Sequence, residues 1–387
     1  MDEVLALVDG VSAGMPLGPT LSLTEPGLTV TIVGSDGSPP LPEASWSSLP
    51  VVRPQDLPQS AVAAIARTVA EHTGEAPWPA RRPSWFRQRW LDAVEVWIDE
   101  QLAASDLVRA GPCSPVRMWS LSAVLRVPIL DDRSVWFKAA CEHFRHEPGI
   151  TRTLGHFAVE AVPRVLAVDE RYSWMLLAPL PETDTDDPRR VAAAAAAMAR
   201  IQVEAIAHVD ELRAAGCPDR GLRATLDAFG HLVHDSVELE HLTPARREAA
   251  VAIVPWVKRR LEDFFGCGIA ESLVHGDLHP GNVAGGDRPV IFDWTDACIS
   301  HPYLDGAHLA RAADEGQRAA VKRAYTAPWH GRGDHARAWE LAPFANRVFQ
   351  AVTHEAIYRA QEDASRWEMA GVVSRTLEEL ADLHRAS

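Results

Sequence analysis

Three oxygen-bearing side chains stand close together in the sequence between Leu273 and Trp294. Asp277 comes five positions before Asn282 in a short polar loop, and Asp293 follows a second apolar run. The spacing D-x-x-x-x-N is typical of a phosphoryl-transfer loop, in which the Asp accepts a hydroxyl proton and the Asn holds a metal ion. Mg²⁺ prefers such oxygen ligands and completes its shell with waters and substrate phosphates. We therefore predict Asp277 as a catalytic base and Asn282 and Asp293 as metal ligands.

Two short apolar runs flank these residues and predict the elements that hold them. Leu273-Val274 leads into the polar loop, and Pro289–Phe292 ends immediately before Asp293. A short apolar run bounded by turn residues is typical of a buried strand. We therefore predict a strand, a catalytic loop and a returning strand that ends in Asp293.

The loop has two other interpretations. His275 and His279 are four positions apart, as in a helical HExxH metal pair. Pro280 and Gly281 would break a helix there, and no Glu lies between the two histidines. A polar turn without chemistry is the other interpretation, and it must explain three polar groups at kinase spacing.

A known family shares this pattern. His275-Gly-Asp-Leu-His-Pro-Gly-Asn282, together with Ile291-Phe-Asp-Trp294, resembles the aminoglycoside phosphotransferase and choline kinase family. The resemblance implies an α+β, protein-kinase-like bilobal fold, with a small antiparallel-sheet N-lobe and a large, mostly helical C-lobe. It also implies ATP and Mg²⁺ as cofactors and a small molecule as substrate.

The predicted domains follow from this resemblance and from composition. Residues 81–180 would form the kinase-like N-lobe, and residues 181–387 the helical C-lobe with the catalytic loop and the acceptor site. Residues 1–80 lie beyond the resemblance and read as an extra α/β appendage of unknown role. Gly27–Val33 predicts a strand in it, Gly34–Pro40 a turn and Pro58–Arg67 a helix. Pro77–Pro83 reads as a linker.

Five strands and two helices are expected in the N-lobe. Ser84–Leu102 carries apolar residues at helical spacing, and its tryptophans Trp85, Trp90 and Trp97 are expected in the core. A second helix is expected over His146–Phe157. The predicted strands are Val116–Ser120, Val124–Leu130, Ser134–Ala139, Val162–Val168 and Ser173–Ala178. The exit from the last strand, up to Leu180, resembles a hinge whose backbone binds adenine.

Lys138 and Glu147 are the expected nucleotide-binding pair. Lys138 ends the third predicted strand, as the ATP-phosphate lysine does in kinases, and Glu147 begins the next helix, where it would hold the lysine. No glycine occurs from Arg117 to Val127, so the Gly-rich phosphate loop of protein kinases is missing. Ser120 and Ser122 are predicted to contact phosphate in its place.

The C-lobe is expected to be almost wholly helical apart from the catalytic segment. One helix begins near Arg189, and two more are expected in Leu222–Phe265 with a break at Glu240–Pro244. The later helices are expected over Tyr303–Ala313, Glu315–Tyr325, Ala336–Gln361 and Trp367–His384.

Some residues are expected to hold the catalytic loop in place, and others show whether it is regulated as in protein kinases. Asp305 resembles a family position that caps a helix and supports the catalytic loop, and His275 is expected to brace the loop through its backbone. Gly276 stands where protein kinases have the Arg of H-R-D, and no A-P-E follows Trp294. Control by a phosphorylated activation loop is therefore not expected.

The acceptor is not identified by the sequence. Acidic residues could face a cationic acceptor or could be surface and capping residues, and both interpretations stay open. The candidates are Asp296, Asp305, Glu355, Glu362 and Asp363.

Composition indicates which partners and which cellular location are expected for the protein. The 387 residues carry a formal net charge of −15, which disfavours nucleic acid as a partner and is compatible with a cationic acceptor. The five cysteines are scattered without a C-x-x-C pair, which indicates reduced thiols. No apolar run is long enough to span a membrane and no basic signal-peptide start is present, so we expect a cytoplasmic protein. The oligomeric state is not determined by the sequence.

The functional prediction is ATP-dependent O-phosphorylation of a small-molecule alcohol. An alternative from another functional class is a nucleotide-binding regulator or scaffold that has a kinase-like fold but does not catalyse phosphoryl transfer. The intact set of kinase residues weighs against that alternative. The set comprises Lys138, Glu147, Asp277, Asn282 and Asp293.

Overall fold

A computed structural model describes residues 21–25, 28–32, 59–185, 187 and 189–386. The chain forms two compact units, each assembled from separate stretches of sequence. The first unit comprises Met1–His143, Leu166–Pro179 and Arg359–Glu368, and the second comprises Phe144–Val165, Leu180–Tyr358 and Met369–Ser387.

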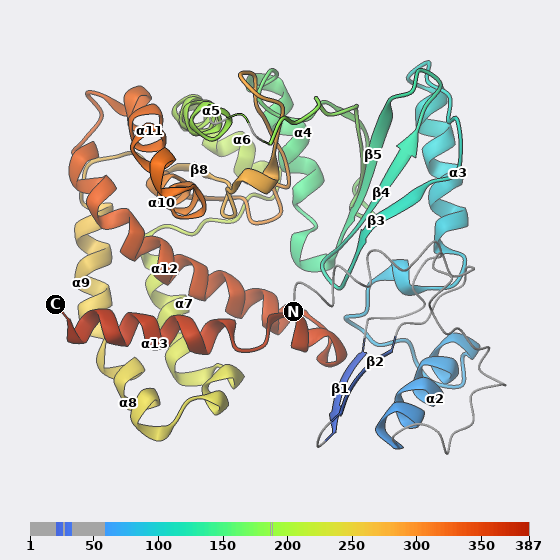
Figure 1. The fold of residues 1–387 in the computed structure, drawn as a ribbon, viewed down its shortest axis with the longest axis horizontal. Coiled ribbons are helices and arrows are strands. Elements are labelled where there is room, and N and C mark those ends of the chain that lie inside the picture. Colours follow the sequence, from blue (N-terminus) through green and yellow to red (C-terminus); the bar gives the residue numbers. More distant parts are fainter. Residues whose placement is uncertain (1–20, 26–27, 33–58, 186, 188, 387) are drawn as a thin grey trace. The chain divides into compact units, whose positions relative to one another are not determined.

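A five-stranded sheet forms the centre of the first unit (Figure 1). Its strand order is β3-β4-β5-β7-β6, and the pairs β3–β4, β4–β5 and β5–β7 are antiparallel. The predicted five strands are thus confirmed, with ends shifted by up to three residues. Their bounds are β3 Ser114–Met118, β4 Ser122–Pro128, β5 Ser134–Ala140, β6 Val165–Asp169 and β7 Trp174–Leu177.

Helix α3 (Trp90–Ala103) packs on this sheet. Val94, Ile98 and Leu102 repeat every four residues and are fully or almost fully buried, as the apolar stripe of a core-facing helix should be. The core places of Trp85 and Trp90 are confirmed, and Trp97 packs against the same cluster partly buried.

The predicted start of that helix at Ser84 is wrong. Residues Ser84–Phe86 form a separate 3₁₀ turn, η2, because Arg87 is extended and Arg89 is left-handed at φ 63°. The break lets Trp85 enter the core and donate its indole N–H to the carbonyl oxygen of Trp119 at 2.8 Å. A continuous helix would not place both Trp85 and Trp90 in one cluster.

The described part of the N-terminal segment contains a hairpin and a helix. β1 (Leu21–Glu25) pairs antiparallel with β2 (Leu28–Ile32), which confirms the strand predicted there and adds β1. The predicted turn at Gly34–Pro40 lies outside the described residues. α2 (Gln59–Thr73) confirms the predicted helix and extends it by six residues beyond Arg67.

Pro77–Pro83 has no regular secondary structure, but it is anchored to its neighbours. The Arg82 side chain is buried and forms ion pairs with Glu71 of α2 and with Glu362, at 3.0 Å in the latter case. One guanidinium therefore joins segments that are 280 residues apart in sequence.

The second unit is mainly helical around a large apolar core. The helix predicted near Arg189 and those predicted from Tyr303 onward are confirmed, but the predicted start of the last one at Trp367 is wrong. The 3₁₀ segment Asp363–Met369 and a left-handed Gly371 precede α13, which begins at Val372. The bounds are α4 Glu147–Phe157, α5 Arg190–Ala205, α6 Val209–Ala214, α7 Leu222–Asp235, α8 Pro244–Ala252, α9 Val254–Phe265, α10 Tyr303–Ala312, α11 Glu315–Thr326, α12 His335–Ala360 and α13 Val372–Arg385. The last residues of α12 belong to the first unit.

The prediction of two helices in Leu222–Phe265 is wrong, because the segment holds α7, α8 and α9. α8 ends at Ala252 and α9 begins at Val254 with a proline in its first turn. A proline has no N–H to continue the preceding helix but is well suited to start the next one.

Two small antiparallel pairs hold the catalytic segment. β8 (Ser272–Val274) pairs with β11 (Cys298–Ser300), and β9 (Val283–Ala284) pairs with β10 (Val290–Ile291). The predicted strands on either side of the loop are confirmed as β8 and β10. They do not pair with each other, since each takes a short strand that was not predicted as its partner.

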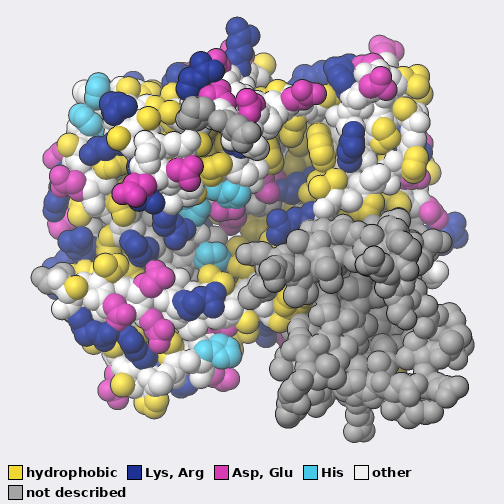
Figure 2. Space-filling model, in the orientation of Figure 1, with side chains coloured by type: hydrophobic (Ala, Val, Ile, Leu, Met, Phe, Trp, Pro, Cys, Tyr) yellow, Lys and Arg dark blue, Asp and Glu magenta, His cyan; other side chains and the backbone are white. Residues whose placement is uncertain are grey.

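The charge distribution on the surface and the character of the helices can be compared with what the composition predicts. Acidic and basic side chains are interspersed on the face that Figure 2 shows, so the net negative charge is not gathered into one patch there. No helix within the described ranges has the length and apolar character needed to cross a membrane.

Candidate active site

The loop between β8 and β9 depends on a glycine. Gly276 has φ +86°, and a Cβ at this position would lie 2.4 Å from the carbonyl oxygen of Asp296. A larger residue would therefore need both a strained backbone and a displaced neighbouring chain. This explains in physical terms why the Arg of H-R-D has no counterpart here.

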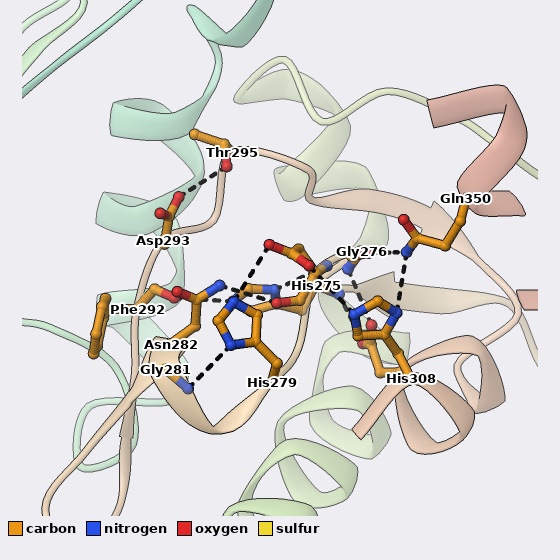
Figure 3. A network of polar contacts seen from close by, with 12 residues as sticks. His275, Gly276, His279, Gly281, Asn282, Phe292, Asp293, Thr295, His308 and Gln350 are labelled. Atoms are coloured by element: carbon orange, nitrogen blue, oxygen red, sulfur yellow. Dashed lines mark hydrogen bonds and ion pairs between the residues drawn. The ribbon is translucent and has the colours of Figure 1, made fainter. Parts of the chain in front are cut away.

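Asn282 and Asp293 are brought side by side by the β9–β10 pair. Asn282 directly precedes β9, and its carbonyl oxygen accepts the N–H of Phe292 at 3.0 Å, one residue before Asp293. Figure 3 shows these three residues on adjacent segments. The structure thus brings together the two predicted metal ligands on neighbouring backbone.

Internal hydrogen bonds orient both side chains. The Asn282 amide nitrogen donates to the carbonyl oxygen of Asp277 at 3.0 Å, so its Oδ1 is the atom that can bind a cation. Asp293 has a left-handed backbone at φ +66°, and the Thr295 hydroxyl donates to its Oδ1 at 2.8 Å. Left-handed geometry is uncommon for a residue other than glycine and is concentrated at functional sites.

The donor set fits Mg²⁺ of the kinase type. One amide oxygen and one carboxylate are hard ligands, and Mg²⁺ takes its remaining ligands from water and phosphate. Among the described residues, no three or more His, Cys, Asp or Glu side chains cluster to hold a metal ion by themselves. A Mg²⁺ held by Asn282 and Asp293 would complete its shell with water and phosphate oxygens.

His275 braces the loop, as expected. Its Nδ1 accepts the N–H of Asp277 at 3.3 Å, which leaves the ring proton on Nε2. That Nε2 lies 3.0 Å from the carbonyl oxygen of Phe292 and donates to it. Burial lowers the pKa of His275, although the carbonyl of Phe292 raises it in part, so the ring is neutral in this role.

Asp305 supports the same loop from α10, and its predicted structural role is confirmed. Its Oδ2 accepts the N–H of His275 at 2.7 Å and the Gln202 amide at 2.9 Å, and its Oδ1 accepts the N–H of Gly276 at 3.0 Å. Burial raises the pKa of Asp305 to about 7, against the lowering effect of the two backbone donors. This carboxylate holds the start of the catalytic loop and is too buried to bind a substrate.

Asp277 is a partly accessible carboxylate of the loop, with its side chain 44% exposed. Its Oδ1 lies 3.3 Å from Nε2 of His308, and its Oδ2 lies 3.6 Å from Nε2 of His279. Burial raises the pKa of Asp277, but the hydrogen bond from His308 and the nearby histidines outweigh burial, so the net pKa is lowered. The group is therefore ionised at neutral pH and able to accept a proton.

Lys138 and Glu147 fall in different units. Lys138 lies on β5, buried, opposite Val124 of β4 and Met175 of β7. Glu147 is fully buried at the first residue of α4. Each stands at the element predicted for it, and their pairing around a nucleotide stays a prediction.

Ser120 and Ser122 flank the turn between β3 and β4, and both hydroxyl groups are engaged within the protein. Ser120 donates to Glu368 at 2.5 Å and accepts from the Gln361 amide at 2.7 Å. Ser122 accepts the indole N–H of Trp119 at 2.9 Å. Both residues are buried, so a phosphate contact through their side chains would require these bonds to be exchanged.

The acidic residues that were candidates for acceptor binding differ in their burial and in their partners. Glu355 is buried and accepts the Ser236 hydroxyl at 2.5 Å, while Glu362 is paired with Arg82. Asp363 forms an ion pair with Arg366 at 2.9 Å on the first unit. Asp296 contributes the carbonyl that closes on Gly276.

Two residues at Asp277 were missed by sequence reasoning. His308 of α10 contacts its carboxylate, and Gln350 of α12 donates to the carbonyl oxygen of Gly276 at 2.7 Å (Figure 3). His308 stands three residues after Asp305, which puts both on one helix face, so that spacing could have found it. Gln350 carries no such signal, because its partners are 74 and 42 residues away.

Comparison with a family model identifies related sequences. The model described as "Phosphotransferase enzyme family" matches residues 123–341, which is more than half of the 387-residue chain. The match includes the whole catalytic segment and starts well after residue 80. No curated protein matches the sequence.

Solved structures share the fold at low sequence identity. The GDP complex of aminoglycoside 2'-phosphotransferase-IIIa superimposes with a TM-score of 0.51 at 16% identity, over 75% of this chain and 99% of that one. The Plasmodium vivax ethanolamine kinase gives 0.52 at 12% identity, over 76% and 91%. The GDP and kanamycin complex of APH(2")-IIia gives 0.50 at 16% identity, over 73% and 98%. The predicted α+β, protein-kinase-like fold is confirmed.

Proposed function

Because the chain belongs to the phosphotransferase enzyme family and is a small-molecule kinase, we propose that it transfers the γ-phosphoryl group of ATP to a hydroxyl of a small molecule. The observation that carries this proposal is the β8-to-β10 segment. There Asp277, Asn282 and Asp293 lie on adjacent backbone, joined by the hydrogen bonds Asn282 Nδ2 to Asp277 O and Phe292 N to Asn282 O.

Asp277 is the proposed general base. The acceptor oxygen forms a bond to the γ-phosphorus while the bond from phosphorus to the bridging oxygen of ADP breaks, and the hydroxyl proton passes to the Asp277 carboxylate. Its lowered pKa keeps it ionised before the reaction, and its side chain is 44% exposed, so an acceptor can approach it. Phosphoryl transfer depends mainly on positioning and charge stabilisation, which suits a base held on a braced loop.

Asn282 and Asp293 are the proposed Mg²⁺ ligands. A bound Mg²⁺ would neutralise phosphate charge and orient the γ-phosphoryl group. In the protein, the amide nitrogen of Asn282 and the Thr295 hydroxyl at Asp293 fix which oxygens remain for that ion. The left-handed backbone of Asp293 aims its carboxylate from the end of β10.

The proposed nucleotide contacts are those of Lys138, Glu147, Ser120 and Ser122. Lys138 of β5 would bind the phosphates, with Glu147 of α4 as its ion-pair partner. Ser120 and Ser122 lie at the turn proposed to cover phosphate. Both hydroxyls and the backbone N–H of Ser120 have internal partners, so a phosphate contact there would exchange some of these bonds. This arrangement would replace the missing Gly-rich loop.

The acceptor is proposed to be a small alcohol, and its charge is open to test. The formal charge of −15 is compatible with a cationic acceptor, and one structural neighbour binds kanamycin while another is an ethanolamine kinase. Two neighbours are GDP complexes, so GTP is the alternative phosphoryl donor. We place the reaction in the cytoplasm, where either donor is abundant.

The test is a mass-spectrometric screen. The full chain is incubated with Mg²⁺ and either ATP or GTP and with a panel of aminoglycosides, macrolides, amino alcohols and sugars. The expected result is one acceptor that gains a single phosphoryl group with ATP, at a rate that depends on Mg²⁺.

Controls separate the proposal from its alternative. The Asp277→Ala variant should produce no phosphorylated acceptor from the same mixture. Tight Mg-ATP binding by the wild-type protein without transfer to any panel member would favour a nucleotide-binding regulator instead.

A further inference from the structure

We propose that His308 is a positioning residue for Asp277: Gln350 holds its ring in one tautomer, and the ring then fixes the carboxylate by donating to Oδ1. This inference rests on the proposed function, since it concerns how the base is oriented. It assigns roles to two residues that no motif of the catalytic loop contains. The three side chains come from the loop, from α10 and from α12.

The orientation of the Gln350 amide follows from its partner. The amide nitrogen lies 2.7 Å from the carbonyl oxygen of Gly276, and a carbonyl oxygen can only accept a hydrogen bond. The NH₂ end of the amide must therefore point toward Gly276. That same nitrogen lies 3.3 Å from Nδ1 of His308 and has a second hydrogen to donate there.

The tautomer of His308 follows in turn. Because Gln350 presents a donor to Nδ1, that ring nitrogen must be the acceptor, and the neutral ring carries its proton on Nε2. Nε2 lies 3.3 Å from Oδ1 of Asp277, an acceptor. In each of the three successive contacts, from Gly276 O to Gln350, from Gln350 to His308 and from His308 to Asp277, a donor thus faces an acceptor.

The two side chains differ in burial, and this decides from which side His308 contacts the Asp277 carboxylate. The His308 side chain is 9% exposed, whereas the side chain of Asp277 is 44% exposed. The hydrogen bond therefore approaches the carboxylate from its buried side and leaves the exposed side to the acceptor. A hydrogen bond in a buried setting competes less with water than one at the surface.

His279 provides an internal comparison. Its Nδ1 accepts the N–H of Gly281 at 3.0 Å, so its Nε2 also carries the proton. That Nε2 is 3.6 Å from Oδ2 of Asp277, too long for a hydrogen bond, and its side chain is 39% exposed. Of the two rings, only that of His308 is both close enough and buried enough to fix the carboxylate.

The hydrogen-bond arrangement is testable without any substrate. In protein labelled with ¹⁵N-histidine, the His308 ring should show a protonated Nε2 and an unprotonated Nδ1. Its signals are assigned by their loss in His308→Gln. A protonated Nδ1 at a pH where the ring is neutral would overturn the proposed role of Gln350.

The kinetic consequence is tested with two variants. His308→Leu removes the donor, and its kcat should fall about 10- to 100-fold with KM for ATP unchanged, as expected when a hydrogen bond to a charged group is lost. His308→Gln keeps an N–H donor near the position of Nε2 and should recover most of this loss. His231→Gln, at a ring 79% exposed, is the matched control and should retain the wild-type kcat.

The outcomes separate this inference from the proposed function. If the wild-type protein phosphorylates an acceptor and His308→Leu does so at the same kcat, positioning by His308 is refuted. Equal losses in His308→Leu and His308→Gln, with both folded, would also refute it, because only the donor should matter. If the wild-type protein transfers no phosphoryl group, the proposed function fails, and the ring-nitrogen signals still decide the tautomer.

Discussion

Asp305 offers a perturbation whose cost can be worked from the structure. The carboxylate accepts three buried N–H groups, two at Oδ2 and one at Oδ1. In Asp305→Asn the amide oxygen can keep the two donors at the Oδ2 side, while the new NH₂ group faces the N–H of Gly276. One buried donor then loses its acceptor, at a cost of about 1–3 kcal/mol.

This free-energy cost of Asp305→Asn predicts a lower melting temperature and a slower turnover. Each kcal/mol lowers Tm by roughly 2–4 °C in a domain of this size, so Asp305→Asn should lower it by about 2–12 °C. The loop that begins at His275 would also shift, and an error of about 1 Å in the base can reduce turnover roughly 100-fold. Asp305→Ala, which leaves all three donors without an acceptor, should cost about 3–9 kcal/mol by the same count.

Calorimetry and urea denaturation measure the stability, and the rate is measured on the acceptor found by the screen. Asp210→Asn is the control, because the Asp210 side chain is fully exposed and its ion pair with Arg213 is at 3.5 Å on the surface. The control should remain within about 0.5 kcal/mol of the wild type. A stability of Asp305→Asn equal to that of Asp210→Asn would refute the role given to Asp305.

Three further predictions concern other parts of the molecule. Gly276→Ala should destabilise the protein by more than about 1 kcal/mol in urea denaturation and abolish turnover, and wild-type stability would count against the need for glycine there. Arg82→Met should cost about 3–5 kcal/mol, because Glu71 and Glu362 would be left as buried carboxylates. Burial already raises the pKa of Glu362, so this loss should shrink as pH falls and the carboxylates take up protons; a loss that grows toward acid pH would contradict it. Asn282→Ala should raise the Mg²⁺ concentration needed for half-maximal activity, and an unchanged Mg²⁺ dependence would exclude it as a ligand.

The parts of the site that sequence predicts are those built by local spacing. Asp277, Asn282 and Asp293 come together because a tight loop and one short hairpin join them within 17 residues. The sheet of the first unit was predictable because apolar residues alternate along β4, with Ala123, Leu125 and Val127 all buried.

The parts that sequence does not predict depend on distant partners. β8 pairs with β11, so the strand that leads into the loop is held by a segment beyond Asp293. Arg82 meets Glu362 across 280 residues, and no local pattern marks that pair. The split of the expected helix at Arg89 likewise follows from the packing of two tryptophans against the sheet, which spacing alone does not contain.

The central claim is that the loop carboxylate acts in the chemical step and not in nucleotide binding. Asp277→Asn tests it most directly, by calorimetric titration with Mg-ATP and by phosphoryl transfer to the identified acceptor, with the wild-type protein measured alongside. We predict an unchanged affinity for Mg-ATP and a kcat lower by about 100- to 10,000-fold. A variant that transfers phosphate at the wild-type rate would contradict the account.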